Sequence, residues 1–98
     1  MKILALEKEM PAAQPADFAP HLQAEARRVW ELTQQGKLRE TYFRADRDEA
    51  VLILECDSLD EARAVLDSLP LVQAGLITFD CIPLKPYPGF ARLFTPAE

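Results

Sequence analysis

The sequence predicts an α+β fold built on one four-stranded antiparallel sheet. Apolar segments of strand length occur at residues 2–7, 37–44, 49–56 and 76–84. Between them lie residues 17–35 and 58–69, where apolar side chains recur every three or four positions, as on one face of a helix. With 98 residues, the chain has room for one small domain.

The N-terminal part is expected to form a strand and then a helix. Pro11 and Pro15 keep the connecting segment out of regular structure. Asp17 is the expected N-cap, because its carboxylate can accept from the free N–H groups of the first turn. The apolar stripe of the helix is expected to bury Trp30, and Gly36 is expected to end the helix.

The C-terminal part is expected to contain a hairpin, a second helix and a last strand. Residues 45–48 supply the turn of the hairpin. Ser58 and Glu61 have the spacing of a capping box at a helix start, and Pro70 is expected to end that helix. Residues 85–98 then form a tail rich in proline and aromatic side chains.

The predicted order is strand, helix, strand, strand, helix, strand. Because crossover connections are right-handed and do not cross each other, this order gives the ferredoxin-like arrangement. Residues 1–98 are thus expected to form a single domain, with both helices on one face of the sheet.

The opposite, helix-free face of the sheet is predicted from the alternation of strand side chains. It is expected to mix apolar and polar side chains; the apolar ones are Val51, Ile53, Leu76 and Ile82. Such a face is too apolar for water and too charged for a dry core. We therefore expect a homodimer with a polar cleft between two sheets, although an antiparallel sheet with one solvated side is the alternative.

The candidate site residues are the polar side chains of this face. Carboxylates in a partly dry cleft have raised pKa values and can transfer protons, a tyrosine can donate to an oxyanion, and an arginine can hold a substrate carboxylate. The alternative is a set of structural ion pairs across the dimer. The predicted catalytic residues are Glu40, Asp80, Glu55 and Tyr42, and the predicted substrate-binding residues are Arg44 and Thr78.

Other chemistries have weaker support in the sequence. His21 is the single histidine, in the first turn of a helix, and is interpreted as a surface or packing residue. Cys56 and Cys81 are expected at inward strand positions as small hydrophobic residues, so a thiol-based redox protein is the less favoured alternative. Their spacing matches no metal site, and we expect neither a metal nor another cofactor.

The composition narrows the choice of partners. A net charge of -5 repels phosphate backbones, so neither nucleic acid nor an anionic membrane is expected as a partner. No apolar run approaches the roughly 20 residues that span a bilayer. The absence of an export signal and the two cysteines favour a cytoplasmic protein with free thiols.

Several motifs in the second half of the chain resemble the muconolactone delta-isomerase family. Gln35-Gly36-Lys37 enters a strand, Ser68-Leu69-Pro70-Leu71 ends the second helix, and Ile82-Pro83-Leu84 closes the last strand. The segments Tyr42-Phe43-Arg44-Ala45-Asp46-Arg47 and Pro86-Tyr87-Pro88-Gly89-Phe90 are similar to small bacterial relatives of that isomerase. The resemblance covers roughly residues 34 to 94.

The resemblance implies a dimeric α+β barrel, either alone or within a larger ring. It also implies a reaction that moves a double bond in an unsaturated lactone by proton transfer, without cofactor or metal. The chain departs from the family at residues 38–42, Leu-Arg-Glu-Thr-Tyr, where the isomerase carries a histidine and bulky apolar residues. The resemblance therefore transfers no catalytic residue. We expect a cofactor-independent isomerase acting on a small carboxylated or cyclic metabolite, the alternative being a non-catalytic binding or assembly module.

Overall fold

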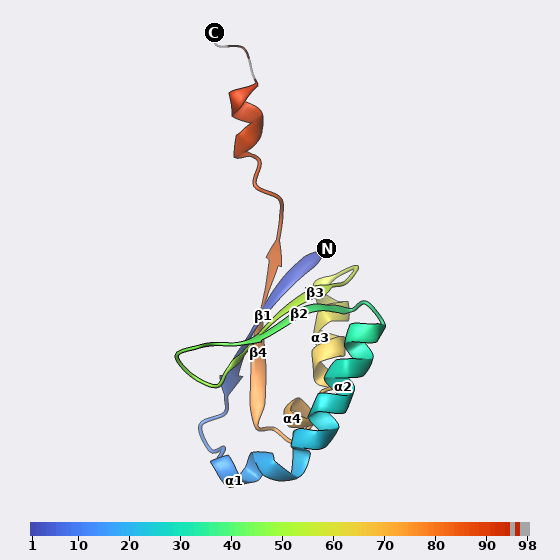
Figure 1. Cartoon of the computed structure of the whole chain (residues 1–98), viewed down its shortest axis with the longest axis vertical. Coiled ribbons are helices and arrows are strands. Elements are labelled where there is room, and N and C mark those ends of the chain that lie inside the picture. The colour runs from blue at the N-terminus through green and yellow to red at the C-terminus, as the bar shows by residue number, and fades with distance from the viewer. Residues whose placement is uncertain (95, 97–98) are drawn as a thin grey trace.

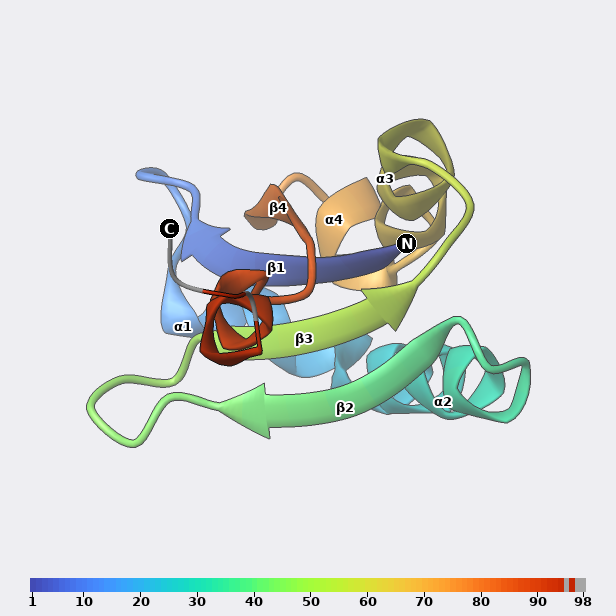
Figure 2. The same ribbon diagram turned by 90° about the horizontal axis from the view of Figure 1, so that it is seen from above.

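The computed structural model describes residues 1–94 and 96 and contains the predicted sheet. Its strands are β1 (Lys2–Glu9), β2 (Leu38–Phe43), β3 (Ala50–Glu55) and β4 (Ile77–Leu84). They pair antiparallel in the order β2-β3-β1-β4, as seen from above in Figure 2. This is the ferredoxin-like order, so the predicted fold class is confirmed.

The first helical region consists of α1 (Pro15–Phe18), the 3₁₀ turn η1 (Ala19–His21) and α2 (Leu22–Gln34). The second consists of α3 (Leu59–Asp67) and α4 (Pro70–Gln73). The helices α2, α3 and α4 lie on one side of the sheet, to its right in the nearly edge-on view of Figure 1, and α1 lies below it. Pro70 is the first residue of α4, because a proline is tolerated in the first turn of a helix but not in its interior.

Three predictions for the first helical region were wrong. Pro15 was expected in an irregular connection but is the first residue of α1, a position that tolerates proline. Asp17 lies inside α1, where its carboxylate accepts from the backbone N–H of Gln14, the residue that stands at the N-cap. Trp30 is 61% exposed. Each helical residue advances by about 100°, so Trp30, two positions before buried Leu32, points away from the core.

At the other helix ends, Gly36 follows α2 as predicted, and one of the two hydrogen bonds of the predicted capping box forms. Gly36 and Gly75 adopt φ values of 76° and 75° directly after α2 and α4, a left-handed conformation that favours glycine. The Ser58 hydroxyl accepts from the backbone N–H of Glu61, as a capping box requires. The Glu61 carboxylate accepts from the N–H of Asp57 instead of that of Ser58.

The two faces of the sheet have the predicted compositions. Ile3, Ala5, Leu54 and Ile77 are buried against the helices. On the other face, Leu4 pairs with Ile53 on one side and Ile82 on the other. Leu76 is an exception: it precedes β4 and packs against the core instead of joining the helix-free face.

The chain continues beyond the sheet as an arm, residues 85–94, which projects from the top of the body in Figure 1. The 3₁₀ turn η2 (Gly89–Leu93) lies in the arm, and the rings of Tyr87 and Phe90 stack edge to face with centroids 5.0 Å apart. Phe90, Leu93 and Phe94 are 67%, 76% and 83% exposed. The arm therefore presents an apolar surface that its own body does not cover.

Candidate functional site

The predicted site residues lie on the helix-free face, as their alternation required, but one chain does not gather them into a cluster. Tyr42, Val51, Leu6 and Asp80 form one row across the sheet. Since β2 and β4 are opposite edges, Tyr42 and Asp80 are three strand spacings apart, about 14 Å. Within one chain, no single ligand-sized space joins these two side chains.

The charged side chains of this face are partnered locally. The Tyr42 hydroxyl donates to Glu40 at 2.8 Å, which raises the pKa of Tyr42. Asp80 pairs with Lys8 at 2.7 Å. Arg44, just beyond the end of β2, binds Asp46 with two hydrogen bonds of 2.6 and 2.9 Å. Thr78, the second predicted substrate-binding residue, is exposed opposite Lys8 in the β1–β4 register. Within one chain, these charged groups therefore have local partners, and the cleft between two copies stays a prediction.

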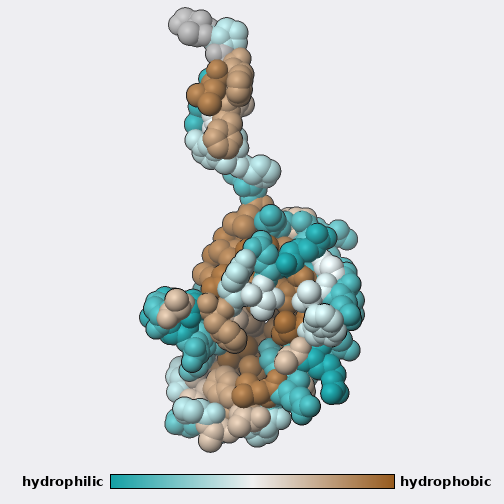
Figure 3. Space-filling model, viewed as in Figure 1, coloured by the Kyte–Doolittle hydropathy of each residue, from teal (hydrophilic) through white to brown (hydrophobic). Residues whose placement is uncertain are grey.

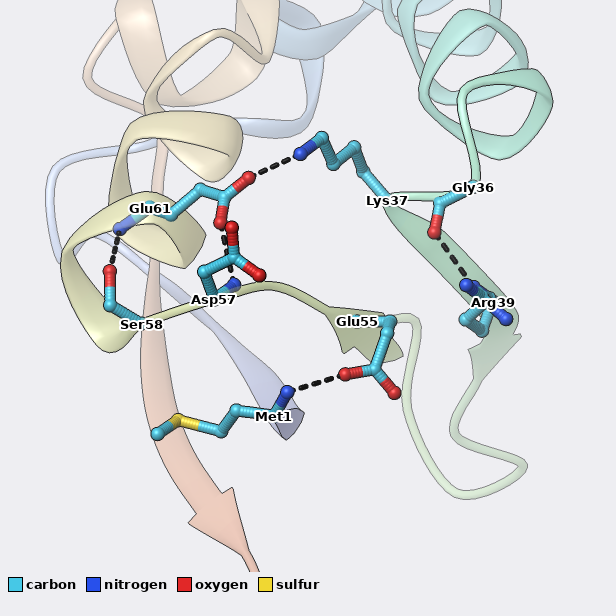
Figure 4. A network of polar contacts seen from close by, with 8 residues as sticks. All are labelled: Met1, Gly36, Lys37, Arg39, Glu55, Asp57, Ser58 and Glu61. Atoms are coloured by element: carbon cyan, nitrogen blue, oxygen red, sulfur yellow. Dashed lines mark hydrogen bonds and ion pairs between the residues drawn. The ribbon is translucent and has the colours of Figure 1, made fainter.

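Glu55 is held at the end of the sheet shown in Figure 4. The amino group of Met1 donates to its carboxylate at 2.6 Å and lowers the pKa of Glu55, opposite to the expected direction. Beside it, Lys37 pairs with Glu61 and so connects the start of β2 to the start of α3. Both ion pairs serve to fasten neighbouring elements together.

A groove large enough for a small molecule lies on the opposite, helix-covered side of the sheet. This groove of about 780 Å³ opens between the sheet and the first helical region. Its apolar walls include Phe18 and Val29 from the helices and Leu52 and Phe79 from the strands. Figure 3 shows such hydrophobic surface between the sheet and α2. The volume falls within the range of about 300–1,000 Å³ that is typical of small-molecule sites.

Two of the carboxyl groups that line this groove, from different elements, are buried or half-buried. Glu7, only 9% exposed, comes from β1 and accepts from the backbone N–H of Ala50 at 3.2 Å. Glu25, half-buried, comes from α2 and accepts through Oε1 from the N–H of Leu71 at 2.9 Å. Among the described residues, the second oxygen of Glu25 has no hydrogen-bond partner.

Burial raises the pKa of both carboxyl groups above the ordinary value of a glutamate. For Glu25, the hydrogen bond from Leu71 and the nearby His21 act in the opposite direction. For Glu7, the Ala50 hydrogen bond opposes the rise, whereas the carboxylates of Glu49, Glu9 and Glu25 add to it. A carboxyl group with a raised pKa can act as either acid or base nearer neutrality, so this groove has the electrostatics expected earlier for the other face.

Neither glutamate was predicted as a site residue, although the sequence carries a signal for each. β1 continues to Glu9, so Glu7 shares its alternation with inward-facing Ile3 and Ala5. Glu25 follows Leu22 by three residues and precedes Val29 by four, which places it on the same helical stripe. A glutamate at a position where the periodicity calls for an apolar side chain indicates a buried carboxyl group.

The remaining candidates are the two cysteines and His21. Cys56 is buried, Cys81 is half-buried, and burial raises the pKa of both thiols, which disfavours a reactive thiolate. His21 ends η1 and is half-buried. In the part of the chain that the structure describes, no group of three or more His, Cys, Asp or Glu side chains is placed to hold a metal ion. None of the helices within residues 1–94 and 96 combines the length and apolar content needed to span a bilayer.

Comparison with known proteins places the fold in a family. Among solved structures, muconolactone isomerase superposes with a TM-score of 0.74 at 18% sequence identity, covering 90% of this chain and 92% of that one. The 5-chloro-2-hydroxyhydroquinone dehydrochlorinase TftG from Burkholderia phenoliruptrix AC1100, in complex with 2,5-dihydroxybenzoquinone, superposes with a TM-score of 0.68 at 21% identity. That match covers 87% of this chain and 94% of TftG. A search of curated proteins finds no matching sequence. The family model of muconolactone delta-isomerase matches residues 3–89, and the chain therefore belongs to the muconolactone delta-isomerase family.

Proposed function

We propose that this protein binds a small cyclic compound in the groove between the sheet and α2, and shifts a double bond in it by proton transfer. The supporting observation is the pair of carboxyl groups, Glu7 and Glu25, whose pKa values burial raises inside an apolar groove of about 780 Å³. Both related structures are of enzymes named for small cyclic compounds, a lactone and a hydroquinone. Fold alone does not set activity, so the proposal depends on the groove.

Glu25 is the proposed proton carrier. Leu71 fixes one of its oxygens, and the other is available to a bound ring. In the proposed step, the ionised carboxylate removes a proton from the carbon between the ring carbonyl and the double bond. The electrons move through the carbonyl, and the protonated carboxyl returns the proton at the far end of the double bond. Atoms and charge balance without a further reactant.

The proposed activity is tested with the uncharged unsaturated lactone 5-methyl-2(3H)-furanone in deuterated water. Proton transfer through Glu25 predicts deuterium incorporation and double-bond migration, followed by NMR, and at least a hundredfold loss of rate in Glu25→Gln. Glu31→Gln is the matched control, since Glu31 lies exposed on the same helix. Full activity in Glu25→Gln would remove Glu25 from the mechanism, and binding without exchange would favour the non-catalytic binding module.

The helix-free face is the proposed dimer interface. Leu4, Leu6, Val51 and Ile53 remain half-buried there with no helix over them, and Ile82 is 40% exposed. Lys8 and Asp80 on the same face allow a twofold-related copy to place opposite charges across the interface. The exposed aromatic arm provides further apolar area for a second copy. A dimer, alone or within a larger ring, in a reducing cytoplasm would also suit the two free thiols.

A second candidate site is the cleft that such a dimer would enclose. There Glu40, Tyr42, Arg44 and Asp80 of one copy would face those of another, which brings together groups that one chain keeps apart. Asp80→Asn and Glu40→Gln distinguish the two sites. If the cleft is the site, they abolish lactone turnover in an intact dimer; if the groove is the site, turnover persists.

A further inference from the structure

The acidic and basic side chains around the groove are unevenly distributed. Four carboxyl groups are among its described lining residues, those of Glu7, Glu9, Glu25 and Asp48, and no lysine, arginine or histidine is. His21 lies close enough to influence Glu25 but is not part of the lining. An entering ligand therefore meets acidic groups at the rim, where Glu9 and Asp48 are exposed, and again inside.

This distribution opposes an anionic ligand for two reasons. A carboxylate that leaves water for an apolar groove loses its hydration, and the described lining offers no cation to replace it. It is also repelled by ionised carboxylates at short range, where the low dielectric strengthens the interaction. Ionised Glu25, as the proposed base, adds to this repulsion, so an anionic substrate would disfavour the protonation state that the reaction needs.

We propose that the groove binds cyclic oxygen compounds that lack a carboxylate, such as lactones, quinones and phenols, and rejects those that carry one. This inference rests on the proposed function, because it names the substrate class of the same groove. Carbonyl and hydroxyl oxygens suit it, since a protonated carboxyl group donates to a carbonyl and an ionised one accepts from a hydroxyl. The apolar walls formed by Val29, Leu52 and Phe79 suit a ring.

The test uses three derivatives of one ring at pH 7: muconolactone with its free carboxylate, its uncharged methyl ester, and its cationic 2-aminoethyl amide. Dissociation constants are measured by NMR titration of the full chain, with resonances of Val29 and Phe79 reporting on the groove. We expect the ester and the amide each to bind at least tenfold more tightly than the acid, because the acidic lining repels only the carboxylate. Equal or tighter groove binding of the acid would overturn the selection while leaving the groove as the site. If none of the three shifts these resonances, the proposed function falls and the selection falls with it.

Charge-neutralising variants test the cause of the selection. Glu9→Gln removes a rim charge without changing the proposed proton carrier, and we expect it to reduce the preference for the ester over the acid about threefold to tenfold. Glu31→Gln, on α2 but outside the groove lining, is expected to leave this preference unchanged. An identical reduction in both variants would show that net charge, and not the lining, controls binding.

Discussion

Glu25 has two roles that different substitutions separate. Its carboxylate accepts from the N–H of Leu71, the second residue of α4, and so satisfies a donor that the start of this short helix leaves free. It is also the proposed proton carrier. Glutamine keeps an acceptor oxygen at the same reach but cannot transfer a proton, whereas alanine removes both functions.

The expected magnitudes follow from the partly buried 2.9 Å hydrogen bond. A hydrogen bond to a charged group contributes about 1.5–3 kcal/mol, so Glu25→Ala is expected to destabilise the protein by about 2 kcal/mol. For a domain of this size, that lowers Tm by about 8–16 °C. Glu25→Gln loses part of the hydrogen bond but no longer buries a charge, and its Tm should stay within about 5 °C of wild type.

Thermal unfolding followed by circular dichroism at pH 7 measures both variants, with Glu31→Ala as the exposed control on the same helix. The reasoning predicts a low Tm and no lactone exchange for Glu25→Ala, and a near-normal Tm with no exchange for Glu25→Gln. A glutamine variant as unstable as the alanine variant would refute the proposed role of the Leu71 hydrogen bond. A stable glutamine variant with normal exchange would refute the proposed proton transfer.

The remaining predictions concern pH, assembly and the thiols. Since burial raises the pKa of Glu7, the folded chain binds this proton more tightly than the unfolded chain, and stability is lost as pH rises from about 4.5 through the raised pKa. Glu7→Gln should therefore gain stability relative to wild type between pH 4 and pH 7 in urea unfolding, and a constant difference would contradict this. Ile53→Asp should weaken self-association at least a hundredfold in sedimentation equilibrium without loss of the fold. Removal of residues 85–98 should weaken self-association less than Ile53→Asp does. A monomeric wild-type protein would rule out the interface. Cys56 and Cys81 should react with a maleimide at least tenfold more slowly than free glutathione at pH 7, because burial raises the pKa of both; fast labelling would restore the redox alternative.

The fold was predictable because the hydrophobic periodicity and the positions of turn and capping residues agree along the chain. The apolar segment at residues 49–56 predicted a strand, and alternation, which placed Val51 and Ile53 on the helix-free face, assigned Leu52 and Leu54 to the helix-covered face. Gly36 ended a helix where the backbone needs a positive φ. Trp30, whose burial was wrongly predicted, lies on the edge of a broad helical stripe, where periodicity alone does not separate buried from exposed positions.

The site was less predictable, because it depends on the strand order and on how segments distant in the sequence pack together. Alternation correctly placed Tyr42 and Asp80 on one face, but only the strand order reveals that they lie on opposite edges of the sheet. Glu7 and Glu25 belong to segments 18 residues apart that meet only in the packed structure. Polar residues on a face without helices are easily noticed in a sequence, whereas a carboxyl group within an apolar pattern is easily taken for a boundary.

The central claim is that ligand binds on the helix-covered side of the sheet. Strand β3 allows a direct test, because its consecutive residues point to opposite faces. Leu52 points to the helix-covered side, whereas Val51 and Ile53 point to the helix-free face. Isotope-filtered NOE spectra of the protein with the methyl ester of muconolactone should connect ligand protons to the methyl groups of Leu52 and Val29. Contacts to the methyl groups of Val51 and Ile53 in their place would contradict the claim and move the site to the face between subunits.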